Sequence, residues 1–355
     1  MARSHLTLAA LATSAVAGFD PVQARPFSTG AHGDFFAAVV IDASGRELIV
    51  RVPNSAEAEA QLTSEKYALE TMTPGIRSRL TFSVPDLVGR ATWNKTFGLV
   101  FEFLPGQQLS IADLSADSAL PVAIGSALAS IHSLPTNFVA DAGLPFFTSL
   151  EVQRQTRDLV ERASASKMLP AALAVRWQEA AGDDTLWMFE PTVIHGSLGA
   201  DSLVAGEDSL AGILGWAALR VGDPAWDLHW LINASLDVQD ATFAAYVDAR
   251  RSLADPKLRQ RATLYSELEL ARWLMHGIAQ KNTVIVEDAV DMLDRLVDAV
   301  RQEPTNSVGQ ETAPILTVTE VVDLLDETPG DAPVGRYRGL QPVTDDQRSS
   351  NSASE

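Results

Sequence analysis

The chain has 355 residues, of which 46% are hydrophobic and 21% are charged, so it can bury a large core and form more than one lobe. Its 46 acidic and 27 basic residues give a formal net charge of −19, which argues against nucleic acid and an anionic membrane surface as partners. Because the chain has no cysteine, disulfides, thiolate metal sites and a thiol nucleophile are excluded. We expect a cytoplasmic protein whose partners are small molecules or other proteins.

The first part of the chain has the pattern of a small β-rich lobe, which we expect over residues 1–104. An apolar run from Leu6 to Ala17, ended by Gly18, fits a packed helix or a secretory signal, and the strands that follow favour the helix. No segment reaches the roughly 20 apolar residues of a membrane span. Ser55 is a candidate N-cap for the helix inside this lobe. The expected strands and helix cover residues 35–41, 47–52, 56–72 and 99–104.

After Gly106 the apolar residues recur at helical spacing, which predicts a larger helical lobe over residues 105–303. A β segment over residues 192–216 interrupts the helices. The expected helices cover residues 119–134, 150–165, 169–181, 241–253, 258–280 and 286–301.

The last part of the chain, residues 304–355, is rich in Thr, Pro, Gly and Ser and carries nine acidic residues and three arginines. This composition predicts a mostly disordered tail. Residues 318–325 have the spacing of one short amphipathic helix, which docks either on its own domain or on a partner. A protein partner bound through residues 305–355 therefore stays open as a hypothesis.

The most informative stretch is Val193-Ile-His-Gly-Ser-Leu-Gly-Ala-Asp-Ser-Leu-Val204, followed by Ala211-Gly-Ile-Leu-Gly-Trp216 and Gly222-Asp-Pro-Ala-Trp-Asp-Leu228. Here the chain resembles the aminoglycoside and macrolide phosphotransferases, whose pattern is H-G-D-x-x-x-x-N, then I-D-W, then G-D-P-x-x-D-L. The resemblance covers about residues 20–300. It implies an α+β, protein-kinase-like fold of two lobes and phosphoryl transfer from ATP or GTP with magnesium to a small molecule.

The sequence departs from this pattern at three positions. Ser197 stands where the family has its catalytic Asp, Ser202 where it has Asn, and Gly215 where it has the metal-binding Asp. A serine is a poor base at neutral pH, and loss of a general base typically forfeits about 10²–10⁴ in rate. Glycine offers no side-chain oxygen to magnesium. We therefore interpret the chain as a catalytically degenerate, binding member of the family, with no need for a cofactor in that case.

Other residues of the pattern are retained. His195 matches a position that the resemblance makes as much a packing residue as a catalytic one. Asp227 matches the aspartate that braces the backbone of the catalytic loop, and we expect Asp223 to help hold the same loop. Asp201, one residue before Ser202, is the possible substitute ligand for a metal, against the alternative of a solvated loop carboxylate.

The nucleotide end of such a site needs a cation for the phosphates, braced by a glutamate. Only five of the 27 basic residues are lysines, and none lies in the expected hairpin, so Arg51 is the candidate cation and Glu65 its expected partner. The alternative is that Arg51 is a surface residue of its strand. The other candidate nucleotide-binding residues are Ser28, Gly30 and Gly33 in a phosphate-covering loop and Glu102 and Leu104 at the hinge.

The helix over residues 258–280 carries Glu267, Glu269 and Arg272, which form either an acidic wall for a cationic sugar antibiotic or a solvated face. We expect Trp216, Trp226, Trp230 and Trp273 in the core of the large lobe. Three functions remain open at this point: a degenerate binding protein, an active phosphotransferase with Asp201 on the metal, and a protein-interaction module that uses the acidic tail.

Overall fold

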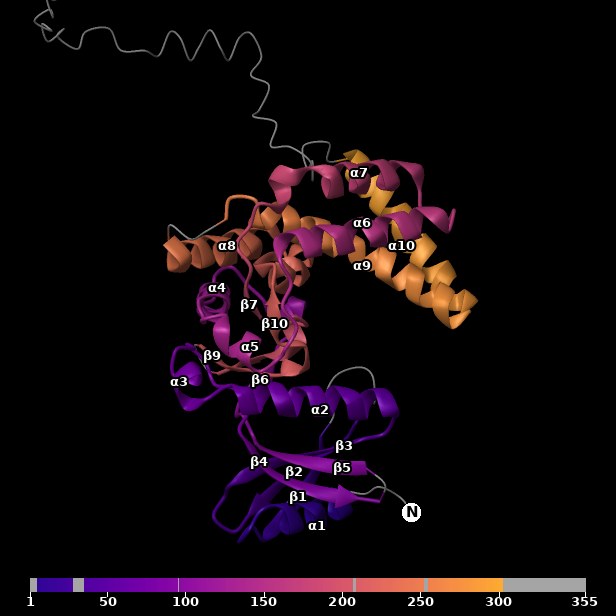
Figure 1. Ribbon diagram of the computed structural model, residues 1–355. Coiled ribbons are helices and arrows are strands. Elements are labelled where there is room, and N and C mark those ends of the chain that lie inside the picture. Colours follow the sequence, from indigo (N-terminus) through magenta and orange to yellow (C-terminus); the bar gives the residue numbers. More distant parts are fainter. Residues whose placement is uncertain (1–4, 28–34, 95, 207–208, 252–254, 303–355) are drawn as a thin grey trace, which may run out of the picture. The chain divides into compact units, whose positions relative to one another are not determined.

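The computed structural model describes residues 5–27, 35–94, 96–206, 209–251 and 255–302 (Figure 1). They include a small antiparallel sheet near the N-terminus and a larger helical part. The α+β class expected from the sequence is therefore confirmed.

The sheet has five strands in the order β1-β2-β3-β5-β4. Its side chains alternate between two faces, as they must in a pleated strand. In β3 the side chains of Leu48, Val50 and Val52 are buried on one face, whereas Ile49 and Arg51 are half-buried on the other. The strands are β1 (Pro21–Phe27), β2 (Phe35–Asp42), β3 (Glu47–Pro53), β4 (Leu87–Trp93) and β5 (Thr96–Glu102).

Two helices cover the two faces of this sheet (Figure 1). The first is α1 (His5–Ala15), which is the N-terminal helix expected from the apolar run, and it packs with Leu48, Val50 and Val52 in one apolar cluster. The second is α2 (Ala56–Thr71), whose predicted N-cap is confirmed because the Ser55 hydroxyl accepts the N–H of Ala58 at 3.1 Å. A one-turn helix, α3 (Pro74–Arg77), follows α2.

The larger part is mainly helical. Its helices are α4 (Leu120–His132), α5 (Asn137–Asp141), α6 (Ser149–Ala165), α7 (Ala171–Gly182), α8 (Leu236–Arg250), α9 (Leu258–Gln280) and α10 (Thr283–Gln302). Its short strands are β6 (Gln107–Gln108), β7 (Thr192–Ile194), β8 (Leu203–Ala205), β9 (Leu210–Ile213) and β10 (Arg220–Gly222). Five 3₁₀ helices connect these elements: η1 (Ile111–Asp113), η2 (Asp184–Trp187), η3 (Ala200–Ser202), η4 (Trp216–Ala218) and η5 (Pro224–Asn233).

One hydrophobic core runs through both parts of the chain. Leu62 and Leu69 of α2 and Leu99 of β5 belong to the same cluster of buried side chains as Leu264 and Leu268 of α9. The cluster around α1 is separate and lies on the other face of the sheet. The face of the sheet that carries Ile49 and Arg51 is thus the one turned toward the helical part.

The helices expected within the described residues are all present, and the largest displacement of a boundary is at the start of α8. The helix predicted over residues 258–280 is α9 with the same limits, whereas the helix predicted to begin at Ala241 already begins at Leu236 in α8. Strands β1 and β4 were not expected.

Two side-chain expectations in α9 are wrong. Trp273 is 38% exposed and donates its indole N–H to Asp288 at 2.8 Å, whereas Trp216 and Trp230 are buried as expected. Glu267 does not lie on a solvated face, because it is 7% exposed and accepts hydrogen bonds from Arg176 and from the Trp177 indole at 2.7 Å. The Glu267 carboxylate therefore ties α9 to α7 as a structural group.

The predicted acidic tail and the amphipathic helix over residues 318–325 lie outside the described residues. Among the residues that are described, no helix is both long enough and apolar enough to cross a lipid bilayer.

Candidate functional site

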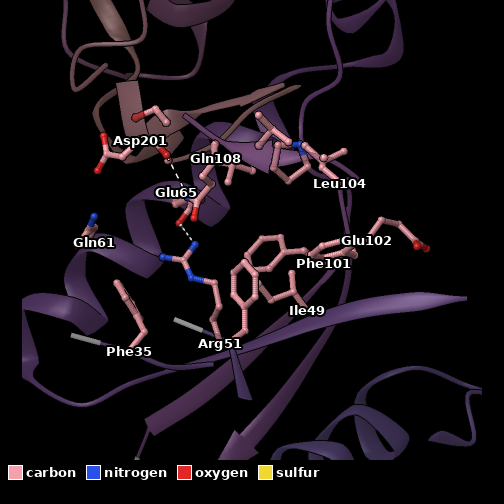
Figure 2. A pocket seen from close by; sticks show the side chains of 18 of the residues that line it. Phe35, Ile49, Arg51, Gln61, Glu65, Phe101, Glu102, Leu104, Gln108 and Asp201 are labelled. Carbon is pink, nitrogen blue, oxygen red and sulfur yellow. Dashed lines mark hydrogen bonds and ion pairs between the residues drawn. The ribbon is translucent and has the colours of Figure 1, made fainter. Parts of the chain in front are cut away.

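A cleft of about 370 Å³ lies where the sheet faces the helical part, and we call it the interlobe cleft (Figure 2). Strands β2, β3 and β5, helix α2, the segment after β5 and the loops after β7 and β9 all contribute to its walls. Its lining residues are Phe27, Phe35, Ile49, Arg51, Gln61, Glu65, Pro85, Phe101, Glu102, Phe103, Leu104, Gly106, Gln108, Ser197, Asp201, Ser202, Val204, Leu214 and Gly215.

The loop over residues 195–202 follows β7 and is anchored by one buried carboxylate. Asp227 of η5 accepts the backbone N–H of His195 at 2.7 Å and that of Gly196 at 2.8 Å, and its Oδ2 lies 3.3 Å from His132 Nε2. Burial alone would raise the pKa of the Asp227 carboxyl, but the hydrogen bonds and neighbouring imidazoles bring it below its ordinary value. The bracing contact that the sequence predicted for Asp227 is therefore present.

His195 is fully buried and is not among the residues that line the interlobe cleft. Its Nε2 lies 2.9 Å from the carbonyl oxygen of Leu214, so this nitrogen carries the proton, and its ring packs edge-on against Trp216 at 4.6 Å between centroids. Burial lowers the pKa of the His195 imidazole. These contacts are those of a packing residue that joins the 195–202 loop to the segment after β9.

The three positions that depart from the family pattern meet at one end of the interlobe cleft. The Ser197 hydroxyl donates to the carbonyl oxygen of Gly215 at 3.3 Å. The Ser202 hydroxyl turns back to its own loop and accepts the N–H of Gly199 at 3.4 Å. Gly215 has φ +83° and no side chain. The three positions that the sequence singled out therefore line the same cleft, and they present two hydrogen-bonded hydroxyls and a glycine without a side chain.

Asp201 is the carboxylate nearest to these positions in the chain. It lines the cleft, and its backbone carbonyl accepts the side-chain N–H of Gln108 at 3.0 Å (Figure 2). Within the described part of the chain its carboxylate has no hydrogen bond or salt bridge, and no group of three or more His, Asp or Glu side chains is placed to hold a metal ion. Magnesium prefers hard oxygen ligands in near-octahedral array, so these residues do not fit the metal site that the family fold implies.

The cationic end of the cleft is formed by Arg51 of β3. Its guanidinium is 2.7 Å from the carboxylate of Glu65 on α2, so the predicted pair is present (Figure 2). The exposed fractions of the two side chains are 14% and 3%, and the guanidinium also lies 4.4 Å above the ring of Phe35. Arg51 Nε is buried without a hydrogen-bond partner among the described residues. The alternative of a surface arginine is excluded.

The two hinge candidates differ in their orientation. Glu102 points away from the cleft in Figure 2 and pairs with Arg46, which directly precedes β3, so its side chain is engaged at the end of β5. Leu104 lines the cleft and gives it an apolar wall. The three candidates of the phosphate-covering loop lie outside the described residues; they are Ser28, Gly30 and Gly33.

The expectation for Asp223 is wrong. Instead of holding the 195–202 loop, its carboxylate accepts hydrogen bonds from Arg261 Nε at 2.7 Å, from the Tyr265 hydroxyl at 2.7 Å and from the N–H of Ala225 at 2.9 Å. The last contact caps η5, and the other two tie this 3₁₀ helix to α9. Asp223 therefore organises the helical part behind the loop rather than the loop itself.

Two polar residues of the cleft were not predicted. Gln108 belongs to β6 and bridges to the 195–202 loop through Asp201, a contact between distant segments with no local signal. Gln61 lies one helical turn before Glu65 on α2, and the i, i+4 spacing places both side chains on the same side of the helix. That spacing could have identified Gln61 once Glu65 was assigned to the cleft.

The comparison with protein families gives one match over most of this architecture. The model of the phosphotransferase enzyme family (APH) matches residues 23–264, which include most of β1, the cleft and the first part of α9. A curated relative, the uncharacterized protein YcbJ of Bacillus subtilis (strain 168), is 23% identical over 209 residues, which make up 55% of this chain and 65% of that protein. The match thus spans slightly less than two thirds of the relative.

Solved structures of antibiotic phosphotransferases are similar to the chain over most of its length. The apoenzyme of macrolide 2′-phosphotransferase MphH from Brachybacterium faecium superposes with a TM-score of 0.68 at 21% identity, covering 81% of this chain and 97% of that enzyme. Macrolide 2′-phosphotransferase type I gives 0.66 at 22% identity, covering 82% and 97%. The GDP complex of wild-type aminoglycoside 2′-phosphotransferase-IIIa gives 0.66 at 17%, covering 82% and 98%. Likeness at these identities establishes the kinase-like fold.

Proposed function

The chain belongs to the phosphotransferase enzyme family, and from that premise we propose that it binds a small molecule or nucleotide in the interlobe cleft without transferring a phosphoryl group. The observation that carries this proposal is the meeting of Ser197, Ser202 and Gly215 at one end of the cleft. These are the three positions at which the family pattern has two aspartates and an asparagine.

Proton transfer is the first function that these positions no longer supply. A general base must take a proton within hydrogen-bond reach of the substrate, and its pKa must lie near the working pH. The Ser197 hydroxyl has neither the basicity nor a base beside it, and it already donates to the carbonyl of Gly215. The loss of general-base help alone corresponds to about 10²–10⁴ in rate.

Neutralisation of the phosphate charge is the second function that these positions no longer supply. Phosphoryl transfer depends on positive charge around the phosphates, which metal ions and cationic side chains supply. Of the described carboxylates in the cleft, Glu65 is paired with Arg51, Glu102 is paired with Arg46, and Asp201 stands alone. Arg51 is the one cation among the described lining residues, and Glu65 braces it as the family pattern requires. The described residues provide no group of side chains for the metal ions that would supply the remaining positive charge. A triphosphate therefore gains little electrostatic stabilisation in such a cleft.

What remains suited to binding is the apolar end of the cleft. Ile49, Phe101 and Leu104 offer a wall for a planar ring. Solved relatives are named as complexes with GDP, ADP and antibiotics, so planar bases are bound on this fold. We infer that binding here rests on the ring and not on the metal-bound phosphates.

The test is a thermal-shift titration with ATP and GTP, with and without Mg²⁺, combined with an assay of phosphate release. We expect any ligand-induced rise of the melting temperature to be the same with and without Mg²⁺, because the cleft has no magnesium ligand set. We expect phosphate release at the background rate with macrolide and aminoglycoside panels. A Mg²⁺-dependent shift together with turnover in the wild-type protein would overturn the proposal.

A matched pair of triple variants makes this test two-sided. Ser197→Asp, Ser202→Asn and Gly215→Asp together restore the family pattern, and we expect this variant to gain Mg²⁺-dependent nucleotide stabilisation. Replacing all three residues by Asn gives a variant of nearly the same shape without the two carboxylates, and we expect no Mg²⁺ response from it. Equal responses in the two variants would show that the absence of carboxylates at these positions is not what prevents Mg²⁺-dependent nucleotide binding.

A second candidate function is an active phosphotransferase with an altered metal site, and one observation favours it. Asp201 lines the cleft with a carboxylate that no described group neutralises. In that case Asp201→Asn would abolish turnover, whereas Glu70→Gln, on the exposed side of α2, would leave it unchanged.

A further inference from the structure

A second cavity, of about 280 Å³, lies in the helical part and shares no lining residue with the interlobe cleft. We call it the α6–α9 cavity, because it is bounded by α6, β10, η5 and α9, three of which are labelled in Figure 1. Its lining residues are Phe147, Val152, Gln155, Thr156, Ile194, Arg220, Gly222, Asp223, Trp226, Tyr265 and Arg272. Most of these are apolar or hydrogen-bonded to the protein, which leaves the two arginines as its unusual feature.

The cavity lies directly behind the 195–202 loop. The Trp226 indole N–H donates to the carbonyl oxygen of Gly196 at 2.8 Å. A Cβ atom added at Gly196 would come within 3.1 Å of the guanidinium carbon of Arg220. The cavity and the interlobe cleft are therefore separated by the backbone of this loop.

Arg220 differs from the other arginines of the chain. Among the described arginines that are not exposed, each except Arg220 makes at least one hydrogen bond or ion pair with a protein group. Within the described part of the chain, the contact of the Arg220 guanidinium is with the ring of Trp226, at 5.5 Å between the guanidinium carbon and the ring centroid. Arg220 is half-buried, and a cation that is partly withdrawn from water without an anion in contact is unfavourable, so a protein rarely retains one without a use for it.

Arg272 adds a second positive charge at the same ring. Its guanidinium carbon lies 4.4 Å from the centroid of Trp226, and it pairs with Glu269, whose side chain is 45% exposed. Burial lowers the pKa of both Arg220 and Arg272, and the positive charge of Arg272 lowers the pKa of Arg220 further. An anion between them would relieve both effects.

None of the described carboxylates near the cavity is in direct contact with Arg220. Asp223 is satisfied by Arg261 and Tyr265, and Asp227 is satisfied by the backbone of the 195–202 loop and by His132. Although the chain has a net charge of −19, Arg220 therefore feels Asp227 only at longer range and has no carboxylate in direct contact among the described groups.

We propose that the α6–α9 cavity binds a small organic oxyanion, with its carboxylate or phosphate on Arg220 and Arg272 and its apolar body against Trp226. A guanidinium matches the two oxygens of a carboxylate or phosphate with parallel N–H donors, and arginine keeps its charge at any physiological pH. Phe147, Val152 and Ile194 supply the apolar walls that a ring-bearing acid requires. This site does not depend on the function of the interlobe cleft.

The experiment titrates the full chain with benzoate, phenyl phosphate and inorganic phosphate at millimolar concentrations and constant ionic strength, and measures the melting temperature. A ligand that binds only the folded state raises this temperature in a saturable manner. We expect a saturable rise with at least one of the two ring-bearing probes. A response to benzoate alone identifies a carboxylic acid as the ligand class, whereas a response to phenyl phosphate alone identifies a phosphate monoester. A linear rise or none with all three probes overturns the proposal.

Two variants with the same change of charge separate this site from a general effect of salt. Arg220→Gln should weaken the saturable response at least about tenfold, which corresponds to one good charge-assisted hydrogen bond. Arg79→Gln, at an exposed position outside the cavity, should leave the response unchanged. An unchanged response in Arg220→Gln overturns the proposal.

The melting temperature without ligand gives an independent readout. If Arg220 serves a ligand, its removal takes away an unpaired desolvated charge, so Arg220→Gln should melt at the same temperature as the wild type or higher. If Arg220 holds the fold together through Trp226, the variant should melt lower, and that result counts against the proposal.

Discussion

Gly196 and Gly215 adopt the same left-handed backbone, with φ +85° and +83°, but only one of them needs to be glycine for reasons of space. A Cβ at Gly196 would collide with the carbonyl oxygen of Ala218. The 195–202 loop could move away from this oxygen only by losing its hydrogen bonds to Asp227. At Gly215 the nearest heavy atom to an added Cβ is His195 Cε1 at 4.0 Å, and the position opens into the interlobe cleft. The metal-binding carboxylate of the family is therefore missing here for no steric reason.

This contrast gives a prediction for two single substitutions. Gly215→Asp should lower the free energy of unfolding by at most about 1–2 kcal/mol, because Asp is one of the residues that tolerate the left-handed region. Gly196→Ala should lower it by about 3 kcal/mol or more, because strain and a backbone collision add up. Urea unfolding followed by circular dichroism measures both values. Equal losses in the two variants would mean that Gly215 is constrained by something other than its backbone angle.

At the scale of elements, the sheet and α2 are joined by the Arg51–Glu65 pair. Strand β3 presents Leu48, Val50 and Val52 to the α1 side, so the pleat turns Arg51 to the side of α2 and the cleft. Helix α2 starts at its Ser55 cap, and it buries Glu65 opposite Arg51. The pair is as much a clamp between two elements as a part of the cleft.

The clamp can be measured with a double-mutant cycle. Arg51→Met or Glu65→Leu alone should lower the free energy of unfolding by about 3–5 kcal/mol, since each leaves a buried charge without its partner. The double variant should lose less than the sum of the two, with a coupling of about 0.5–3 kcal/mol. Glu70→Gln, which breaks the exposed Lys66–Glu70 pair of the same helix, should change stability by no more than about 0.5 kcal/mol. Additive losses in the cycle would contradict a direct clamp.

The elements that sequence reasoning found are those with a strong local period. Helix α9 has apolar residues at helical spacing over its whole length, and its limits were predicted without error. Strand β1 contains Pro21 and Pro26, and β4 contains Gly89, so both resemble loops until β2 and β5 pair with them. The α6–α9 cavity could not be predicted at all, because Arg220 and Arg272 come from segments about fifty residues apart.

At the scale of the whole molecule, the core that runs from α2 and β5 to α9 joins the sheet to the helical part. A shared core of this kind favours unfolding of the two parts in one cooperative transition. His195 belongs to this arrangement, because it is fully buried and joins β7 to the segment after β9. A proton that binds His195 only after unfolding therefore acts on the stability of the entire unit.

This linkage predicts a loss of stability in mild acid. Burial lowers the pKa of folded His195 below the ordinary value of 6.5, so below about pH 6.5 the unfolded chain takes up a proton that the folded chain does not. The free energy of unfolding should fall by up to about 1.4 kcal/mol per pH unit from this group, until the pH reaches the pKa of the folded imidazole. The lowered pKa of Asp227 acts in a separate pH window, below its ordinary value of 3.8.

Urea unfolding at intervals between pH 7.5 and 5 should show a shallower dependence of the free energy of unfolding on pH in His195→Gln than in the wild type. His276→Gln, at an exposed position of α9, should keep the wild-type slope, and equal slopes in all three proteins would remove His195 as the source.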